Sequence, residues 1–235
     1  MIHRLNPRVW LVPLTLVAVL TGIAASQAAA STRAGGQSLI GTFKLTRGSC
    51  VAGSPSGSYF RMIYPGGNLT AGRFFANPDS ACSNKTYTLV RPGTDGGLVT
   101  GVYQASPTPA FDQKGNATAR KITAPQPFTQ IKFGLATLAK DPQSGKSIPS
   151  PSISVTNGKL SGQVQAVWAE WNHLYLNQGS PKPGGSLPGL TKPVSGTYNA
   201  KTGAFVLTWA SAIAGGPFNG FTGFWHLQGR FVAKQ

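Results

Sequence analysis

The chain of 235 residues carries 21 Lys and Arg against 5 Asp and Glu, a net charge of +16, although only 11% of its residues are charged. Its longest basic run is Arg120-Lys121, so a dedicated nucleic-acid patch has no linear signature and we expect no specific nucleic-acid partner. Five acids and three His leave few groups for metal ligation, and no nucleotide-binding motif occurs, so we expect no metal site and no cofactor.

The N-terminal segment has the three-part pattern of a secretory signal. Two arginines in the first eight residues precede an apolar run over residues 9–25, and small residues at 26–30 provide cleavage sites. An uncleaved membrane anchor is the alternative, but Pro13 interrupts the run and a spanning helix needs ~20 apolar residues. We expect residues 1–30 to be removed and residues 31–235 to form a single β-rich domain without a transmembrane segment, secreted or loosely associated with the cell envelope.

The two cysteines, Cys50 and Cys82, both lie in the expected mature part. In an oxidising compartment an even pair indicates one disulfide. Two free thiols or a metal pair are the alternatives, and the absence of a nearby His argues against the metal pair. The bridge would close a loop that, in the chain-entropy model, stabilises the fold by ~3–4 kcal/mol.

Glycine and proline, 30 and 18 residues, punctuate short apolar runs, and long segments with helical periodicity are absent. This pattern predicts an all-β fold, an antiparallel β-sandwich or barrel of about nine strands. In chain order, the expected strands lie within residues 39–46, 58–64, 85–90, 98–103, 128–135, 152–156, 159–168, 194–208 (a hairpin) and 221–232.

The last of these strands has the strongest pattern. Trp225 and Leu227 share one face of residues 221–232, while Phe224 and His226 share the other. Asn157-Gly158 is a strong hairpin signal between two other strands. Residues 166–176 fit either the end of a strand or a short helix. The long loops 106–126 and 177–193 are of a length that is usually functional or mobile.

The C-terminal part of the chain contains a series of short motifs. Between Trp171 and Gly229 the chain contains WN, NQGS, VSGTYN, GGPFNG and GFWHL. This segment of about 60 residues resembles the C-terminal part of uncharacterised exported bacterial β-domain proteins, some of which carry a surface-sorting tail. The resemblance implies an exported or surface-associated β-domain, but no activity and no functional residues. The chain lacks the sorting tail, which favours free secretion or loose envelope association.

The residues for catalysis are scarce. Glu170 lies between Trp168 and Trp171, which would desolvate its carboxyl and raise its pKa, and His173 follows closely. The four aspartates stand next to turn residues, where Asp usually binds backbone. We therefore expect a non-enzymatic protein, with a secreted hydrolase that uses Glu170 and His173 as the alternative.

Aromatic and amide side chains gather in the C-terminal third. Aromatic faces with amide groups suit the C–H faces and hydroxyls of sugars, whereas tryptophans on apolar strand faces belong to the core. The expected ligand-binding residues are Trp171, Asn172, Tyr175, Asn177 and Gln178.

The net charge of the expected mature chain also indicates what kind of partner it binds. Without Arg4 and Arg8, 19 basic residues remain against 5 acids, a net charge of +14. Such a field concentrates anionic partners at the protein surface. We expect a basic domain that associates with an anionic polymer or glycan of the cell envelope. A purely structural surface protein is a further alternative.

Overall fold

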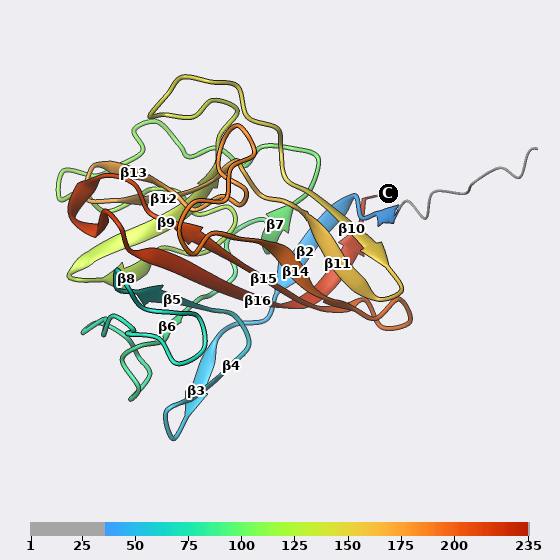
Figure 1. The fold of residues 1–235 in the computed structure, drawn as a ribbon, viewed down its shortest axis with the longest axis horizontal. Coiled ribbons are helices and arrows are strands. Elements are labelled where there is room, and N and C mark those ends of the chain that lie inside the picture. The colour runs from blue at the N-terminus through green and yellow to red at the C-terminus, as the bar shows by residue number, and fades with distance from the viewer. Residues whose placement is uncertain (1–35, 235) are drawn as a thin grey trace, which may run out of the picture. The chain divides into compact units, whose positions relative to one another are not determined.

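The computed structural model describes residues 36–234, which belong to one compact unit. The predicted signal peptide, residues 1–30, lies outside the described residues. The fold is all-β, with antiparallel sheets curled into a half-barrel (Figure 1), as the pattern of short strands and turns predicts. Among the described residues, no helix has the length and apolar character needed to cross a membrane.

The larger sheet has ten strands. Its main path runs in the order β1 (Gln37–Ser38), β10 (Ser152–Thr156), β11 (Lys159–Gln163), β14 (Lys192–Tyr198), β15 (Ala204–Ala212), β16 (Thr222–Ala233), β2 (Gly41–Leu45) and β7 (Gly97–Val99). Off this path, β5 (Tyr59–Ile63) pairs with β16, and β6 (Thr88–Leu89) pairs with β5.

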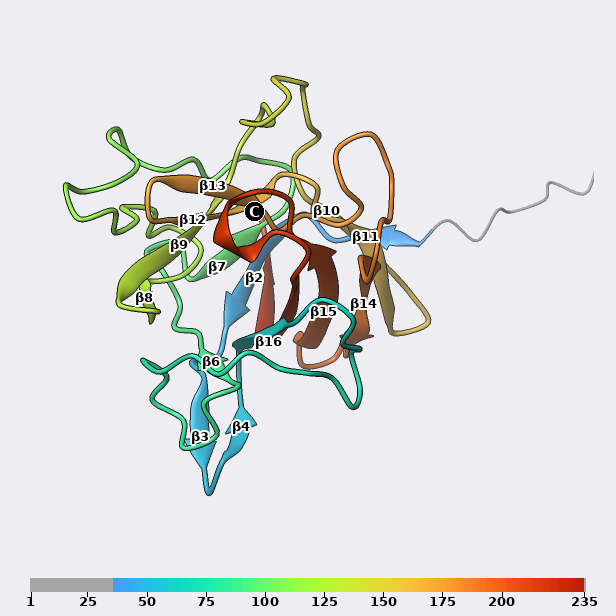
Figure 2. The same cartoon turned by 60° about the vertical axis from the view of Figure 1, so that its left-hand side comes forward.

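The segment that contains β1 and β2 pairs with two distant strands of this sheet, which accounts for its curl. β1 pairs with β10, while β2, only two residues later, pairs with β16 near the other end of the sheet order. Between them, the amide of Leu39 donates to the carbonyl of Ile153 at 2.9 Å. The segment Gln37–Leu45 therefore joins two distant parts of the sheet, and Figure 2 shows the bent surface that results.

A second sheet packs onto the first. Its four strands run in the order β13 (Leu174–Asn177), β12 (Val167–Trp171), β9 (Ile131–Thr137) and β8 (Gln126–Phe128). Side chains alternate along β12: Val167, Ala169 and Trp171 join the main core, whereas Trp168 lies in a separate small apolar cluster. Period-two alternation thus puts Glu170 on the same face as Trp168, away from the main core.

The long strand predicted near the C-terminus is confirmed as β16. Trp225 and Leu227 are 1% exposed, while Phe224 and His226 on the opposite face are only partly buried. The hairpin at Asn157-Gly158 is likewise present between β10 and β11. The hairpin expected over residues 194–208 is formed by β14 and β15, with Gly203 at a φ of 72° in the turn.

The described residues contain sixteen strands rather than about nine. Part of the excess is the small hairpin of β3 (Ser49–Val51) and β4 (Ser54–Ser56). Another part arises because the run expected over 128–135 is broken by Thr129 and Gln130, whose φ values of 48° and 70° form a turn. A single 3-10 turn, η1 (Gly216–Phe218), is the one helical element described.

Residues 166–176, which fitted either a strand or a short helix, form the β12–β13 hairpin. Its two-residue turn is Asn172-His173, with φ values of 49° and 60°. Positive φ at both central residues is the geometry that matches the twist of a two-residue hairpin, and Asn tolerates it better than most residues.

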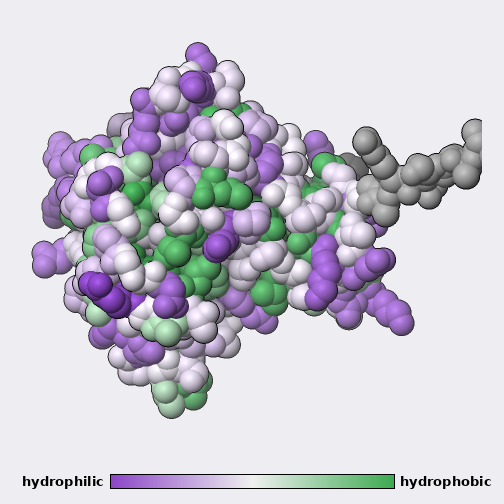
Figure 3. Space-filling view, in the orientation of Figure 1, coloured by the Kyte–Doolittle hydropathy of each residue, from purple (hydrophilic) through white to green (hydrophobic). Residues whose placement is uncertain are grey.

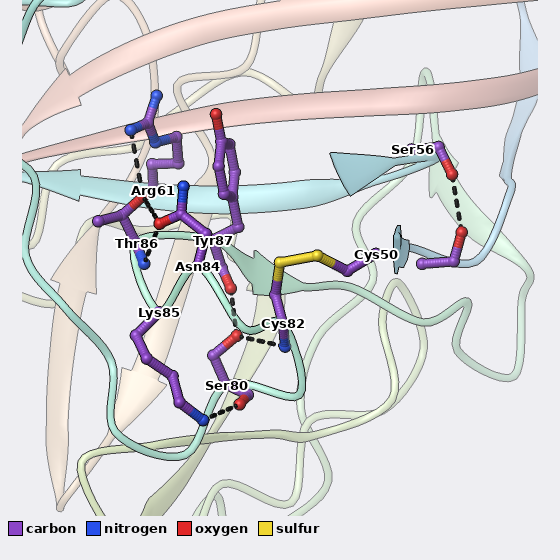
Figure 4. The surroundings of a disulfide bond; sticks show 10 residues. Cys50, Ser56, Arg61, Ser80, Cys82, Asn84, Lys85, Thr86 and Tyr87 are labelled. Carbon is purple, nitrogen blue, oxygen red and sulfur yellow. Dashed lines mark hydrogen bonds between the residues drawn. A yellow bond between two sulfur atoms is a disulfide. The ribbon is translucent and has the colours of Figure 1, made fainter. Parts of the chain in front are cut away.

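The predicted Cys50–Cys82 disulfide is confirmed, with the two Cα atoms 5.3 Å apart. It ties the β3–β4 hairpin to the loop that precedes β6 (Figure 4). The Ser80 hydroxyl accepts from the amide of Cys82 at 3.0 Å, which fixes that loop beside the bridge.

Candidate functional site

The five residues predicted to bind ligand do not share one exposed face. Trp171 is 8% exposed and its indole donates to the carbonyl of Phe128 at 2.9 Å. Asn177 and Gln178 are 5% and 1% exposed. Only Asn172, in the hairpin turn, and the partly buried Tyr175 reach the surface.

Gln178 instead links the two tryptophans of the large sheet. Its side-chain oxygen accepts from the indole of Trp225 at 3.0 Å, and its main-chain oxygen accepts from the indole of Trp209 at 2.7 Å. The Trp209 and Trp225 rings are stacked with centroids 5.8 Å apart. Because buried indole N–H groups need partners, Gln178 fixes the segment after β13 to the core.

Glu170 and His173, the weak catalytic candidates, are not joined by a hydrogen bond. The residue opposite Glu170 across the hairpin is Tyr175, whereas His173 is exposed in the turn, with its ring 5.5 Å from that of Phe111. The partner of Glu170 is the Ser106 hydroxyl, which donates to Oε1. A hydrolase built on this pair gains no support from this arrangement.

The carboxyl of Glu170 has an unusual environment. The residue is 0% exposed, and Oε2 is buried with no hydrogen-bond partner among residues 36–234. Burial raises the pKa of Glu170, and the Ser106 hydrogen bond opposes that shift. Of the two tryptophans that flank Glu170 in sequence, Trp168 shares its face of β12, whereas Trp171 lies in the main core.

A surface pocket of about 420 Å³ lies beside this carboxyl. Its polar lining includes Ser106, Thr108, Glu170 and Tyr175, and Leu138 and Pro142 contribute apolar walls. The pKa of Tyr175 is raised by burial and by the negative charge of Glu170. The pocket thus combines a buried acid with a partly exposed phenol.

Lys182 is a half-buried cation whose ammonium group makes three hydrogen bonds. Its Nζ donates to the main-chain oxygen of Asn177 at 2.9 Å, to Asn177 Oδ1 at 3.1 Å and to Ser211 Oγ at 2.7 Å. Burial lowers the pKa of Lys182 to about 7, and the charge of Asp141 opposes this effect. Three neutral acceptors satisfy its three donors, so Lys182 anchors its loop to β13 and β15.

Sixteen cations within residues 36–234 face solvent, Arg61 is half-buried, and most of the acids are not exposed. Asp95 and Asp112 are the only exposed acids within residues 36–234, while Asp141 and Glu170 are buried. Asp112 Oδ1 accepts from the amides of Lys114 and Asn116, so this aspartate has the turn role expected from the sequence. The exposed cations are Lys44, Arg47, Arg73, Lys85, Arg91, Lys114, Arg120, Lys121, Lys132, Lys140, Lys146, Lys159, Lys192, Lys201, Arg230 and Lys234.

Three of these cations form a cluster that we call the basic corner: Lys44, Lys201 and Arg230. Lys44 on β2 and Arg230 on β16 are directly opposite each other in the antiparallel register. Lys201, in the turn between β14 and β15, lines the same pocket of about 440 Å³ as Arg230. Like charges in such a cross-strand pair repel each other, so the corner favours an anion.

A row of aromatic and cationic side chains covers the outer face of β5 and β16. The rings of Tyr59 and His226 are stacked 4.5 Å apart, and Tyr87 meets Tyr59 edge-on at 5.2 Å. The Arg61 guanidinium lies over the rings of Tyr87 and, at 3.1 Å, of Phe74. Figure 3 shows one face of the molecule, on which hydrophobic residues gather in the middle of the view and hydrophilic residues lie around them.

No local sequence pattern indicates this aromatic row. Its members come from β5, β16 and the segments around residues 74 and 87, which the chain brings together only through long-range pairing. The alternation in residues 221–232 already placed His226 on the outer face, but nothing in the sequence indicates that Tyr59 lies opposite it.

Comparison with known proteins gives no relative, because no family model, curated protein or solved structure matches this chain. Among residues 36–234, no group of three or more His, Cys, Asp or Glu side chains is arranged to hold a metal ion.

Proposed function

We propose that this protein is an exported, non-enzymatic domain that associates with an anionic polymer of the cell envelope. The observation that carries the proposal is the imbalance of exposed charge: sixteen Lys and Arg side chains face solvent within residues 36–234, against two exposed acids, Asp95 and Asp112. Such a surface attracts polyanions from a distance and holds them by many weak contacts. The attraction weakens as salt shortens the Debye length.

Within this general field, the basic corner is the favoured point of contact. Lys44 and Arg230 already repel each other across the strand pair, and a bound phosphate or carboxylate would relieve that repulsion. The aromatic row around Tyr59 and His226 adds partly exposed ring surface that can pack against sugar units of the same polymer.

Co-sedimentation with purified bacterial cell wall tests the proposal. The wall is used before and after extraction of its phosphate-rich anionic polymer, in NaCl from about 0.05 to 0.5 M, over which the Debye length falls to a few ångströms. We expect strong binding to the intact wall at low salt, steep loss at high salt, and little binding after extraction. Binding that is independent of salt or survives extraction contradicts the proposal.

Two matched triple variants locate the contact. Replacement of Lys44, Lys201 and Arg230 by Gln removes the basic corner, and replacement of Lys114, Lys140 and Lys146 by Gln removes the same charge from exposed loops. We expect the first variant to bind the wall at least several-fold more weakly than the second. Equal binding by the two variants would remove the basic corner from the proposal and leave only the general field.

A further inference from the structure

We propose that the pocket beside Glu170 is a binding site for a neutral, hydroxylated ring such as one hexose unit. This inference goes beyond the charge-driven association proposed above, because it concerns a different surface and a different chemistry. Three observations carry it: a buried carboxyl oxygen without a partner, a pocket of about 420 Å³ that this residue lines, and a partly exposed tyrosine opposite it.

One oxygen of the Glu170 carboxyl, Oε2, is buried without a partner within residues 36–234. Glu170 is 0% exposed, and its only hydrogen-bond partner in the described part of the chain, the Ser106 hydroxyl, donates to Oε1. Burial raises the pKa of Glu170, and the hydrogen bond from the Ser106 hydroxyl lowers it. Buried polar atoms are nearly always paired, so an unpaired carboxyl oxygen at a pocket points to a partner supplied by a ligand.

The protonation state of Glu170 decides which ligand group can form a hydrogen bond with Oε2. An ionised Oε2 needs a hydrogen-bond donor, whereas a protonated Oε2 needs an acceptor. A hydroxyl group can serve as either, so a hydroxylated ligand satisfies Glu170 in both states. An ammonium ligand satisfies only the ionised state, and the exposed cations of the protein would repel it.

The walls of the pocket beside Glu170 combine apolar and hydroxyl-bearing side chains. Leu138 and Pro142 offer apolar surface, while Thr108 and Tyr175 add hydroxyl groups. A mixture of apolar surface and a few polar groups suits a sugar ring, and the volume lies in the lower part of the range of ligand pockets. Oε2 is itself covered, so a lining side chain such as Ser106 or Tyr175 has to rotate when the ligand enters.

Saturation-transfer NMR with methyl hexosides tests the inference. The probes are the methyl glycosides of glucose, galactose, mannose and N-acetylglucosamine, and about 0.5 M NaCl suppresses the charge-driven association. We expect saturation transfer to at least one hexoside. No transfer to any of the four would overturn the inference, while leaving the low-salt association with cell wall untouched.

Variants identify the pocket as the site. Ala105→Trp places a bulky side chain at the exposed pocket rim and leaves Glu170 unchanged, and Glu170→Leu removes the carboxyl. We expect at least a tenfold loss of hexoside binding in each, with normal binding by the control Lys159→Gln, since Lys159 is exposed on β11 and does not line the pocket. Full binding by Ala105→Trp, whose core is intact, would overturn the assignment even if Glu170→Leu failed to fold.

Glu170→Gln separates hydroxyl recognition from recognition of a cation. The Gln side chain keeps an oxygen for Ser106 and presents an N–H donor in place of Oε2, which a hydroxyl can accept and an ammonium cannot. We expect this variant to retain hexoside binding within about tenfold. Binding of methylammonium by the parent protein that Glu170→Gln abolishes would replace the hydroxyl assignment with a cation site and overturn the inference.

Discussion

Lys44 and Arg230 face each other across the β2–β16 pair, two positive charges directly opposite in an antiparallel register. Both are exposed, and the corner also holds Lys201, which shares a pocket with Arg230. Natural sheets commonly place opposite charges at such positions, because like charges there destabilise the pair. A cost in stability at this point is consistent with a surface selected to hold an anion.

The first prediction concerns this pair. Arg230→Gln removes the repulsion, so we expect the free energy of unfolding to rise by roughly 0.2–1 kcal/mol at low salt and the gain to shrink at high salt. Urea unfolding at two salt concentrations measures both effects. Lys159→Gln is the control, since Lys159 faces Thr156 and Thr197 rather than a cation. A gain of the same size in the control would contradict the repulsion.

The second prediction concerns Glu170. Burial raises the pKa of this carboxyl above its ordinary value of 4.5, so the folded state holds the proton more tightly than the unfolded chain. The favourable contribution is therefore complete below about pH 4.5 and is lost as pH rises through the folded-state pKa. Relative to Glu170→Gln, the parent protein should lose stability over that rise. Unfolding curves from pH 4 to 8 measure the difference, and a constant difference would contradict the prediction.

The third prediction concerns Lys182, whose contribution to stability should change with pH in the direction opposite to that of Glu170. Its pKa is lowered by burial from 10.5 to about 7, so between these values the unfolded chain binds a proton that the folded protein does not. Stability should therefore rise with pH from about 7 toward 10.5, where this contribution levels off. Lys182→Met should flatten this part of the profile. Thermal unfolding between pH 6.5 and 10 checks it, with the exposed Lys192→Met as the control that keeps the parent slope.

The fourth prediction assigns Gln178 to the core rather than to ligand binding. Gln178→Met keeps similar volume but leaves the indole N–H of Trp225 without its acceptor. An unsatisfied buried donor costs about 1–3 kcal/mol, and we expect a loss of that size in urea unfolding followed by tryptophan fluorescence. The exposed Gln113→Met should change stability little. Binding to cell wall should be the same in both variants, and a specific loss in Gln178→Met would restore it as a ligand residue.

Local patterns predicted much of the fold. Alternation in residues 221–232, the Asn157-Gly158 turn and the even pair of cysteines each identify a feature that the structure contains. The turn at Thr129-Gln130 carried no such signal, because neither residue is one that usually adopts positive φ. The Asn172-His173 turn was equally hard to separate from a short helix.

The candidate sites were less predictable, because they depend on which strands pair. Trp171 and Glu170 are neighbours in sequence, and alternation sends one into the main core and the other toward the Ser106 loop. The sequence indicates that two faces exist but not what covers each of them. Ser106 and Glu170 are 64 residues apart in the sequence. Lys44 and Arg230 of the basic corner likewise meet only because β2 pairs with β16.

The shared segment Gln37–Leu45 also bears on the order in which the chain can fold. Besides the nearer strand β7, it has two distant partners: β10, more than a hundred residues later, and β16, the last strand described. A chain that emerges from the ribosome or a translocation channel N-terminus first presents this segment long before either partner exists. Contacts of such long range form slowly, and an early closed sheet cannot arise from the N-terminal half alone. Under the export proposed above, this topology delays completion of the large sheet until the final strand is present.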